Sequence, residues 1–426
     1  MPNFKRTNNP SIAIELNEAL TFKAGDVITG HVVCTGHVVS PRAWLHVTFT
    51  GTSRVKIRTD DGNGTIRDYE SCSGLISEPV MLTVFDGPIH IPPGPTPEQH
   101  KSWPFSITIP HHRCPPDCRS RQPTTTICHK QSQAKATPPP YSRLPSEPLP
   151  ASFTITTTDI WSKTTHASVS YHLTARFHEE HNSHATQTAT TTLAIAILPS
   201  SIPVLFNSPL HAQTSKHTIY SQRLLGRDNL SLWERFSKSI HAPGVARYEF
   251  EVVVSCPSEL QLGNGPFSFQ VGIIPVSQSE SLGPLEMAGH TVKLERLVLK
   301  LGARTDVTCP EMGLVGFKTG EERGVVNVVW KLVGGVSLPC TPDEVWDIGR
   351  AKGLNFGGSE AIYCDEMGRE GGKETKLPYL SRLYEDFATA NIRHWHELKW
   401  EMKLVVAEET VNVKGSRRVI ILGSSS

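Results

Sequence analysis

Apolar and polar residues alternate along two long stretches of the chain, one late in each half. Every second residue of 167–177 is apolar, and so is every second residue of 398–404. Successive side chains of a β-strand point to opposite faces of a sheet, so this period of two predicts strands with one buried and one solvated face. Such strands are typical of antiparallel sheets packed in pairs.

The same alternation, with turn residues between its stretches, predicts an all-β N-terminal domain over residues 1–198. No amphipathic helix of three turns interrupts the pattern. The strands are expected at 12–16, 27–34, 43–58, 79–91, 103–109, 152–160, 166–178 and 186–197.

Residues 199–244 break the alternation, so we expect an irregular connector there. A plausible N-cap and apolar residues at helical spacing predict one short helix within it, at 229–236. A second all-β domain is then expected over residues 245–426. Its strands are expected at 248–254, 267–273, 292–301, 325–333, 392–406 and 418–422.

Two further features are expected inside the second domain. Thr341, Pro342, Asp343 and Glu344 form a capping box with proline at the first helical position, which predicts a short helix. Gly-rich sequence follows, so an exposed loop is expected at about 341–375. The predicted fold class is therefore all-β, with two immunoglobulin-like β-sandwich domains in tandem and one or two short helices in the connections.

Length and charge narrow the class of protein. At 426 residues the chain is too long for one core and suits two domains of ordinary size. Its 42 basic and 41 acidic residues nearly balance, which argues against nucleic acid as the main partner and still allows a local basic patch.

The N-terminus lacks the apolar run of a secretory signal, and no window approaches the roughly 18 apolar residues that span a bilayer. Nine cysteines, an odd number, fit reduced thiols better than a disulfide framework. We therefore expect a cytoplasmic protein, in which the Asn-X-Ser/Thr matches at Asn63 and Asn229 are not glycosylated.

Several short motifs resemble parts of arrestin-like proteins. Residues 22–32 begin with an aromatic residue, Phe22, and continue through a Gly25-Asp26 turn to a second glycine, Gly30, which is similar to the early strand–turn–strand of the arrestin N-domain. Residues 103–110 look like a later strand of that domain.

Two more segments continue the resemblance in the same order. Residues 149–153, leading to 169–173, resemble the place where the N-domain resumes after its variable loop. Residues 387–392, running on to 396–398, are similar to the long strand of the arrestin C-domain. Together the motifs are most similar to fungal alpha-arrestins and arrestin-domain-containing proteins.

The resemblance implies two sandwiches of about seven strands joined by a short hinge. It also implies no catalytic activity, no cofactor, and a role as an adaptor that links membrane-protein cargo to the trafficking machinery. The expected location is then the cytoplasm, with peripheral association to the plasma membrane or endosomes. Cargo tails of transporters or receptors are the expected partners.

Pro138, Pro139, Pro140 and Tyr141 form a Pro-Pro-X-Tyr motif, hereafter the PPxY motif. Consecutive prolines favour a polyproline II helix, the form that WW domains bind. The motif lies in a stretch at about 111–150 that holds nine prolines. That composition predicts a long, disordered, exposed insert. The resemblance implies that the motif recruits a HECT-type ubiquitin ligase carrying WW domains. The alternative is a chance match in which Tyr141 packs on the sandwich edge.

Arg54, Lys56 and Arg58 alternate with apolar residues, so their charges project from one face of a strand. Such a row is a candidate contact for phosphorylated tails or for an anionic membrane surface. A charged strand face is also a common device against aggregation, and that alternative stays open.

Metal sites are not expected. His394 and His396 share a strand face but lack an identifiable third ligand. Cys114, Cys118, Cys128 and His129, with His111 and His112 nearby in the sequence, match no common structural zinc spacing.

No nucleophile elbow, P-loop or paired-carboxylate motif places catalytic groups, so we expect no enzyme. The leading hypothesis is an adaptor that recruits a WW-containing ligase. One alternative is a scaffold without ubiquitin ligase recruitment, like the arrestin-like subunit of retromer. A more remote one is an all-β hydrolase, because such enzymes also lack short motifs.

Overall fold

The computed structural model forms two compact units, which we describe separately. Unit 1 comprises Met1–Ser200, Asp306–Glu322 and Phe387–Arg393, and unit 2 comprises Ser201–Thr305, Arg323–Asp386 and His394–Ser426. The structure describes residues 10–18, 20–60, 66–76, 79–92, 100–113, 148–158, 163–181, 184–199, 208–221, 224, 247–261, 266–278, 292–309, 320–322, 327–338, 345–352, 361–364, 384–406 and 408–423.

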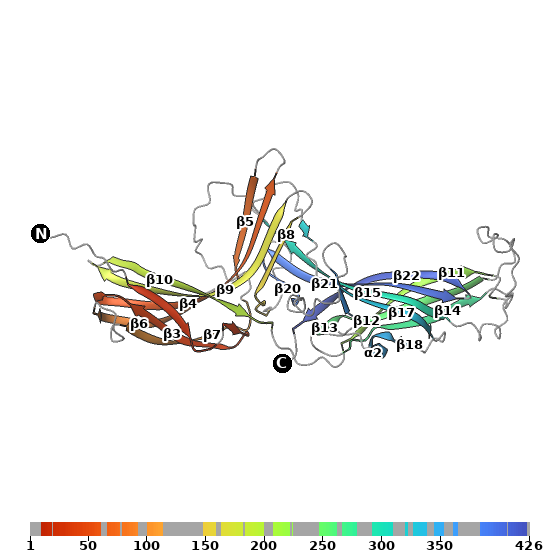
Figure 1. Ribbon diagram of the computed structural model, residues 1–426, viewed down its shortest axis with the longest axis horizontal. Coiled ribbons are helices and arrows are strands. Elements are labelled where there is room, and N and C mark those ends of the chain that lie inside the picture. Colours follow the sequence, from red (N-terminus) through yellow and green to blue (C-terminus); the bar gives the residue numbers. More distant parts are fainter. Residues whose placement is uncertain are drawn as a thin grey trace. The chain divides into compact units, whose positions relative to one another are not determined.

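Unit 1 contains two sheets (Figure 1). The smaller has the order β1-β3-β7, with antiparallel neighbours. The larger has the order β2-β10-β9-β4-β5, and β6 and β8 pair with β4 and β9. The strands are β1 Ser11–Leu16, β2 Thr21–Phe22, β3 Val27–Thr35, β4 Val38–Asp60, β5 Ile66–Gly74, β6 Val80–Ile91, β7 His100–Thr108, β8 Phe153–Thr158, β9 Thr164–His181 and β10 His184–Ile197.

The long antiparallel pair of β4 and β9 forms the spine of unit 1. Every second residue is buried from Ala43 to Ile57 of β4 and from Thr165 to Glu179 of β9, as the alternation requires. Phe49 and Tyr171 are fully buried and stack with ring centroids 6.0 Å apart. The Tyr171 hydroxyl donates a hydrogen bond to the carbonyl oxygen of Pro150 at 2.5 Å, so the polar end of this core tyrosine is satisfied.

Two sheets also account for the strands that lie mainly in unit 2. One has the order β11-β12-β14-β18, and the other has the order β13-β22-β21-β15-β17-β19 with β16 on β15 and β20 on β21. By its contacts β16 belongs to unit 1, and so does β20. The elements are β11 Leu210–Tyr220, β12 Arg247–Pro257, β13 Glu259–Gln261, β14 Gln270–Gln278, β15 Val292–Val307, β16 Gly320–Glu322, β17 Asn327–Leu338, β18 Val345–Asp347, α2 Ile348–Ala351, β19 Ala361–Cys364, β20 Phe387–Ala388, β21 Ile392–Val406 and β22 Glu409–Leu422.

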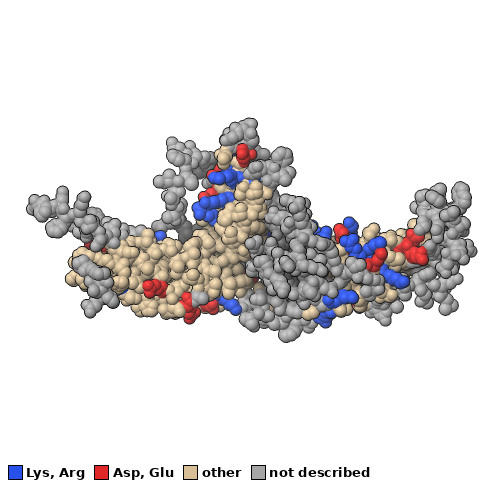
Figure 2. All heavy atoms as spheres, viewed as in Figure 1, with Lys and Arg blue, Asp and Glu red and all other residues tan. Residues whose placement is uncertain are grey.

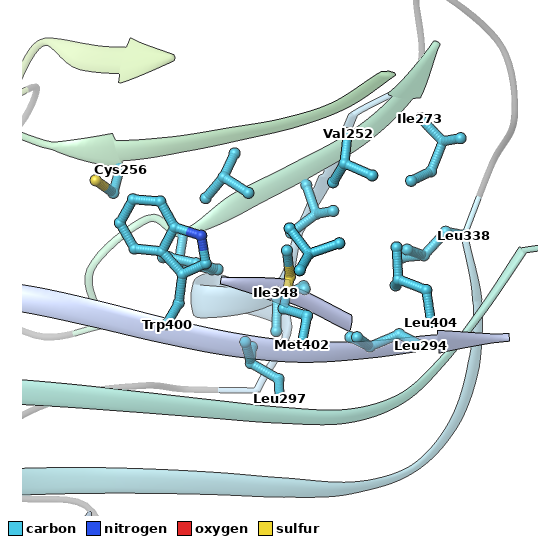
Figure 3. Close-up of a cluster of buried hydrophobic side chains, with 14 of the residues drawn as sticks. Val252, Cys256, Ile273, Leu294, Leu297, Leu338, Ile348, Trp400, Met402 and Leu404 are labelled. Carbon is cyan, nitrogen blue, oxygen red and sulfur yellow. The ribbon is translucent and has the colours of Figure 1, made fainter. Parts of the chain in front are cut away.

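The two sheets of unit 2 enclose one hydrophobic core (Figure 3). Trp400, Met402 and Leu404 project from β21 toward the apolar side chains of β12 and β14, among them Val252 and Ile273. The short helix α2 adds the buried Ile348 to this core. It begins after Asp347, whose carboxylate accepts a hydrogen bond from the backbone N–H of Arg350 at 3.0 Å.

The all-β, two-sandwich prediction is confirmed: strands dominate the structure and the expected strands of both halves are present. The expectation of an irregular connector over 199–244 is wrong in part, because β11 pairs with β12 along its whole length. β11 lies at a sheet edge and is mostly exposed, so its sequence shows little apolar alternation. The predicted helix at 229–236 lies outside the described residues.

The expected loop at 341–375 is also more structured than predicted, because it contains β18, α2 and β19. The capping-box residues Thr341 to Glu344 lie outside the described residues, and the observed helix begins later. β5 was not predicted. Its solvent-facing, charged sequence lacks an apolar period, and only its pairing with β4 makes it a strand.

Candidate functional site

The basic row predicted from the sequence lies on the outer face of β4. Arg54, Lys56 and Arg58 are exposed and are aligned in register with Cys72, Glu70 and Asp68 of β5. The same three positions face Ser168, His166 and Thr164 of β9 on the other side. Figure 2 shows the resulting alternation of blue and red side chains along the part of unit 1 labelled β5 in Figure 1.

Acidic residues of β5 partly neutralise this row. Arg54 forms an ion pair with Glu70. Arg58 donates two hydrogen bonds to the Asp68 carboxylate, at 2.8 and 3.1 Å, and these bonds hold the pKa of Asp68 below its ordinary value. Three cations therefore face two carboxylates. This pairing favours a solvated, charge-paired face, and the predicted contact of these residues with phosphate or an anionic membrane stays a prediction.

The chain segment that holds the PPxY motif is closed at its base. His112 and Pro148 form an antiparallel bridge, and the Leu149 N–H donates a hydrogen bond to the His111 carbonyl oxygen at 3.1 Å. The described residues on either side of the segment are therefore joined to each other between β7 and β8. Pro138, Pro139, Pro140 and Tyr141 lie outside the described residues, as do Cys114, Cys118, Cys128 and His129.

His394 and His396 are brought together, as their shared strand face predicts, with ring centroids 4.9 Å apart. Both side chains are buried, with 4% and 1% of their surface exposed. His394 Nδ1 lies 2.9 Å from the Thr305 hydroxyl, and His396 Nδ1 lies 2.6 Å from a carboxylate oxygen of Asp386. Burial, and secondarily the nearby His396, lowers the pKa of His394 well below its ordinary value.

The two histidines are therefore buried side chains that hydrogen-bond to other residues of the protein. Asp386 also accepts a hydrogen bond from the Ile421 backbone N–H at 3.1 Å, and donates its own N–H to the Ile421 carbonyl at 3.0 Å. Within the part of the chain that the structure describes, no group of three or more His, Cys, Asp or Glu side chains is placed to hold a metal ion.

Sequence reasoning missed the buried amide of Asn391. This residue comes from the second half of the chain but belongs to unit 1. Its side-chain amide donates hydrogen bonds to the carbonyl oxygens of Ser53 and Ser71, at 3.2 and 3.1 Å. Beside it, Phe387 packs edge-to-face on Phe153 of β8, with ring centroids 5.0 Å apart. The only signal in the sequence for this contact between residues 387–393 and unit 1 was a polar residue, Asn391, between apolar strand residues.

We found no match between this chain and any protein-family model or any curated protein. The described residues include no helix with the length and apolar character needed to cross a bilayer.

Proposed function

We propose that the protein is a non-enzymatic, arrestin-like adaptor that links membrane-protein cargo to ubiquitination and endocytic trafficking. The PPxY motif recruits a WW-domain ubiquitin ligase of the HECT type. The support comes from three observations: the tandem all-β architecture, the ordered arrestin-like motifs in the sequence, and the bridge that joins the residues on either side of the motif-bearing segment.

The closed base is the observation that supports ligase recruitment most directly. The bridge between His112 and Pro148 joins the residues on either side of the segment to each other on unit 1. A WW domain recognises polyproline II geometry and the tyrosine ring, which the PPxY motif supplies in its sequence.

Titration of the full chain with an isolated WW domain tests this proposal. We expect the wild-type chain to bind and Tyr141→Ala to lose at least about tenfold in affinity, because an aromatic anchor dominates such small interfaces. Pro145→Ala is the matched control, since it removes a proline from the same segment outside the motif. Equal binding by wild type and Tyr141→Ala would remove the ligase from the proposal.

The edge strand β11 favours a second candidate function, a scaffold of a stable trafficking complex without ligase recruitment. The first five residues of β11, from Leu210 to Thr214, are exposed on both faces. An edge strand offers unpaired backbone groups to a strand of a partner protein. Purification from the native cell separates the two candidates. A stoichiometric complex with no ligase would favour the scaffold, and a substoichiometric ligase that depends on Tyr141 would favour the adaptor.

A further inference from the structure

A second basic face, larger than the one on β4, lies on unit 2. Outward positions alternate with core positions along β21 and β22, and β15 presents its charged residues to the same face on either side of a register shift at Leu294/Arg296. Within unit 2, the outward positions of these three strands hold eight cations and three carboxylates, an excess of five positive charges, whereas the whole chain carries a formal charge of +1. The cations are Lys293, Arg296, Lys300, Arg304, Lys399, Lys403, Lys414 and Arg418, and the carboxylates are Glu295, Glu397 and Glu401.

One end of this basic face contains a tryptophan, Trp395, on the central strand β21. Trp395 of β21 is contacted by the guanidinium of Arg304 at 5.1 Å from the ring centroid and by that of Arg418 at 5.4 Å. These two cations come from the strands on either side of β21, so the ring lies between them in the sheet order. Trp395 is half-buried, and its neighbour Glu397 pairs with both Arg304 and Lys399, at 3.3 and 3.2 Å.

The remaining cations are spread over the face instead of converging on one point. Lys399, Lys403 and Lys414 have side chains that are 49%, 41% and 69% exposed, and each pairs with one of the three carboxylates, Glu397, Glu295 and Glu401. Lys300 is exposed as well, and the excess of cations over carboxylates remains. Figure 2 shows blue side chains, with red between them, over the part of unit 2 labelled β22 and β15 in Figure 1. A spread of cations on a flat sheet matches an extended anionic surface better than a single phosphate group.

We propose that this face of unit 2 docks on the anionic phospholipid surface of a membrane, with Trp395 as its interfacial anchor. Lysine and arginine near a membrane surface are attracted to anionic headgroups over about a Debye length. The indole of tryptophan favours the headgroup region, where its ring is partly buried and its N–H stays in a polar environment. Charge complementarity and the aromatic anchor therefore point to the same occupant. The inference rests on unit 2 alone and is independent of the PPxY motif.

Co-sedimentation of the full chain with vesicles tests the inference. We expect binding to vesicles of phosphatidylcholine with phosphatidylserine, little binding to phosphatidylcholine alone, and a steep decline as salt rises. Lys300→Glu with Lys414→Glu lowers the charge of the face by four and should weaken vesicle binding at least about tenfold. Trp395→Ala should weaken binding too, including to vesicles at high salt, where the electrostatic attraction is screened.

The matched control changes the net charge by the same amount as Lys300→Glu/Lys414→Glu, but outside the basic face of unit 2. Lys101→Glu with Lys352→Glu alters two exposed lysines outside this face and should retain wild-type binding. Thermal melting of each variant, followed by circular dichroism, verifies that it is folded. Equal loss in the control pair, equal binding to neutral vesicles, or binding by Lys300→Glu/Lys414→Glu within about twofold of wild type would overturn the inference. Charge-dependent capture of an acidic peptide without any vesicle binding would overturn it as well. None of these outcomes depends on ligase recruitment.

Discussion

Asn391 and Ser53 form a buried, reciprocal hydrogen-bonded pair between residues that are far apart in the sequence. The Ser53 hydroxyl donates to the Asn391 side-chain oxygen at 2.6 Å, and the Asn391 amide nitrogen donates to the Ser53 carbonyl oxygen at 3.2 Å. Ser53 is completely buried and Asn391 is 4% exposed. The pair fixes the segment Phe387–Arg393 to β4 and so makes residues of the second half of the chain part of unit 1.

Removal of the Asn391 amide should destabilise unit 1. Asn391→Ala leaves the buried Ser53 hydroxyl and two carbonyl oxygens without this partner, which we expect to cost about 1–3 kcal/mol. Urea unfolding of the full chain measures the loss. Asn412→Ala is the control, because this exposed asparagine on β22 should change stability by no more than about 0.5 kcal/mol. Equal stability of the two variants would contradict the role of the buried pair.

Gly415 on β22 should tolerate no side chain. A Cβ atom at this position would lie 2.4 Å from the Trp400 ring, which fills the core of unit 2. We expect Gly415→Ala to cost about 1–3 kcal/mol because a large buried ring must move. The same substitution at Gly74 meets only one backbone oxygen, 3.7 Å away, and should be close to neutral. Thermal melting of the two variants compares them, and an unchanged midpoint for Gly415→Ala would show that the ring has room to shift.

Stability should fall with acidification through the buried His394. Its pKa is lowered well below the ordinary value in the folded chain, so the unfolded chain takes up a proton first as pH falls through about 6.5. The stabilising contribution of neutral His394 is therefore complete above that pH. It declines below it, by at most about 1.4 kcal/mol per pH unit, until the folded chain is protonated too.

Urea unfolding at about pH 7 and about pH 5 measures this dependence. His394→Gln should show a shallower loss than wild type, because glutamine does not titrate. His217 and His178 also have lowered pKa values, chiefly from burial, so some dependence on pH should remain in the variant. Identical pH profiles for wild type and His394→Gln would rule out His394 as the source.

Neutralising the acidic residues of β5 should strengthen anion binding at the row on β4. Asp68→Asn with Glu70→Gln removes the partners of Arg58 and Arg54 and leaves the three cations unopposed. We expect this variant to elute from a heparin column at higher salt than wild type, with an unchanged melting temperature because these pairs are exposed. Glu15→Gln with Asp86→Asn is the control for net charge. If Asp68→Asn/Glu70→Gln eluted at the same salt concentration as the control variant, the basic row on β4 would have no specific role in anion binding.

Local sequence determined most of the strands. Alternation along β4, β9 and β21 specifies which side chains are buried, because the period of a strand is fixed by backbone geometry. Alternation did not predict β5 or β11. Both strands are mostly exposed, so few of their alternate residues are apolar, and they form strands because they pair with a neighbouring strand.

The sequence by itself therefore determined the all-β class, and it supplied the PPxY motif. Only the tertiary structure decided which charges act together. It placed Asp68 and Glu70 against the predicted basic row, and it gathered cations from β15, β21 and β22, which lie between Lys293 and Arg418 in the sequence, on one face around Trp395. The physical reason is that strand pairing joins distant segments side by side, and the sign of a surface depends on all the strands that form it.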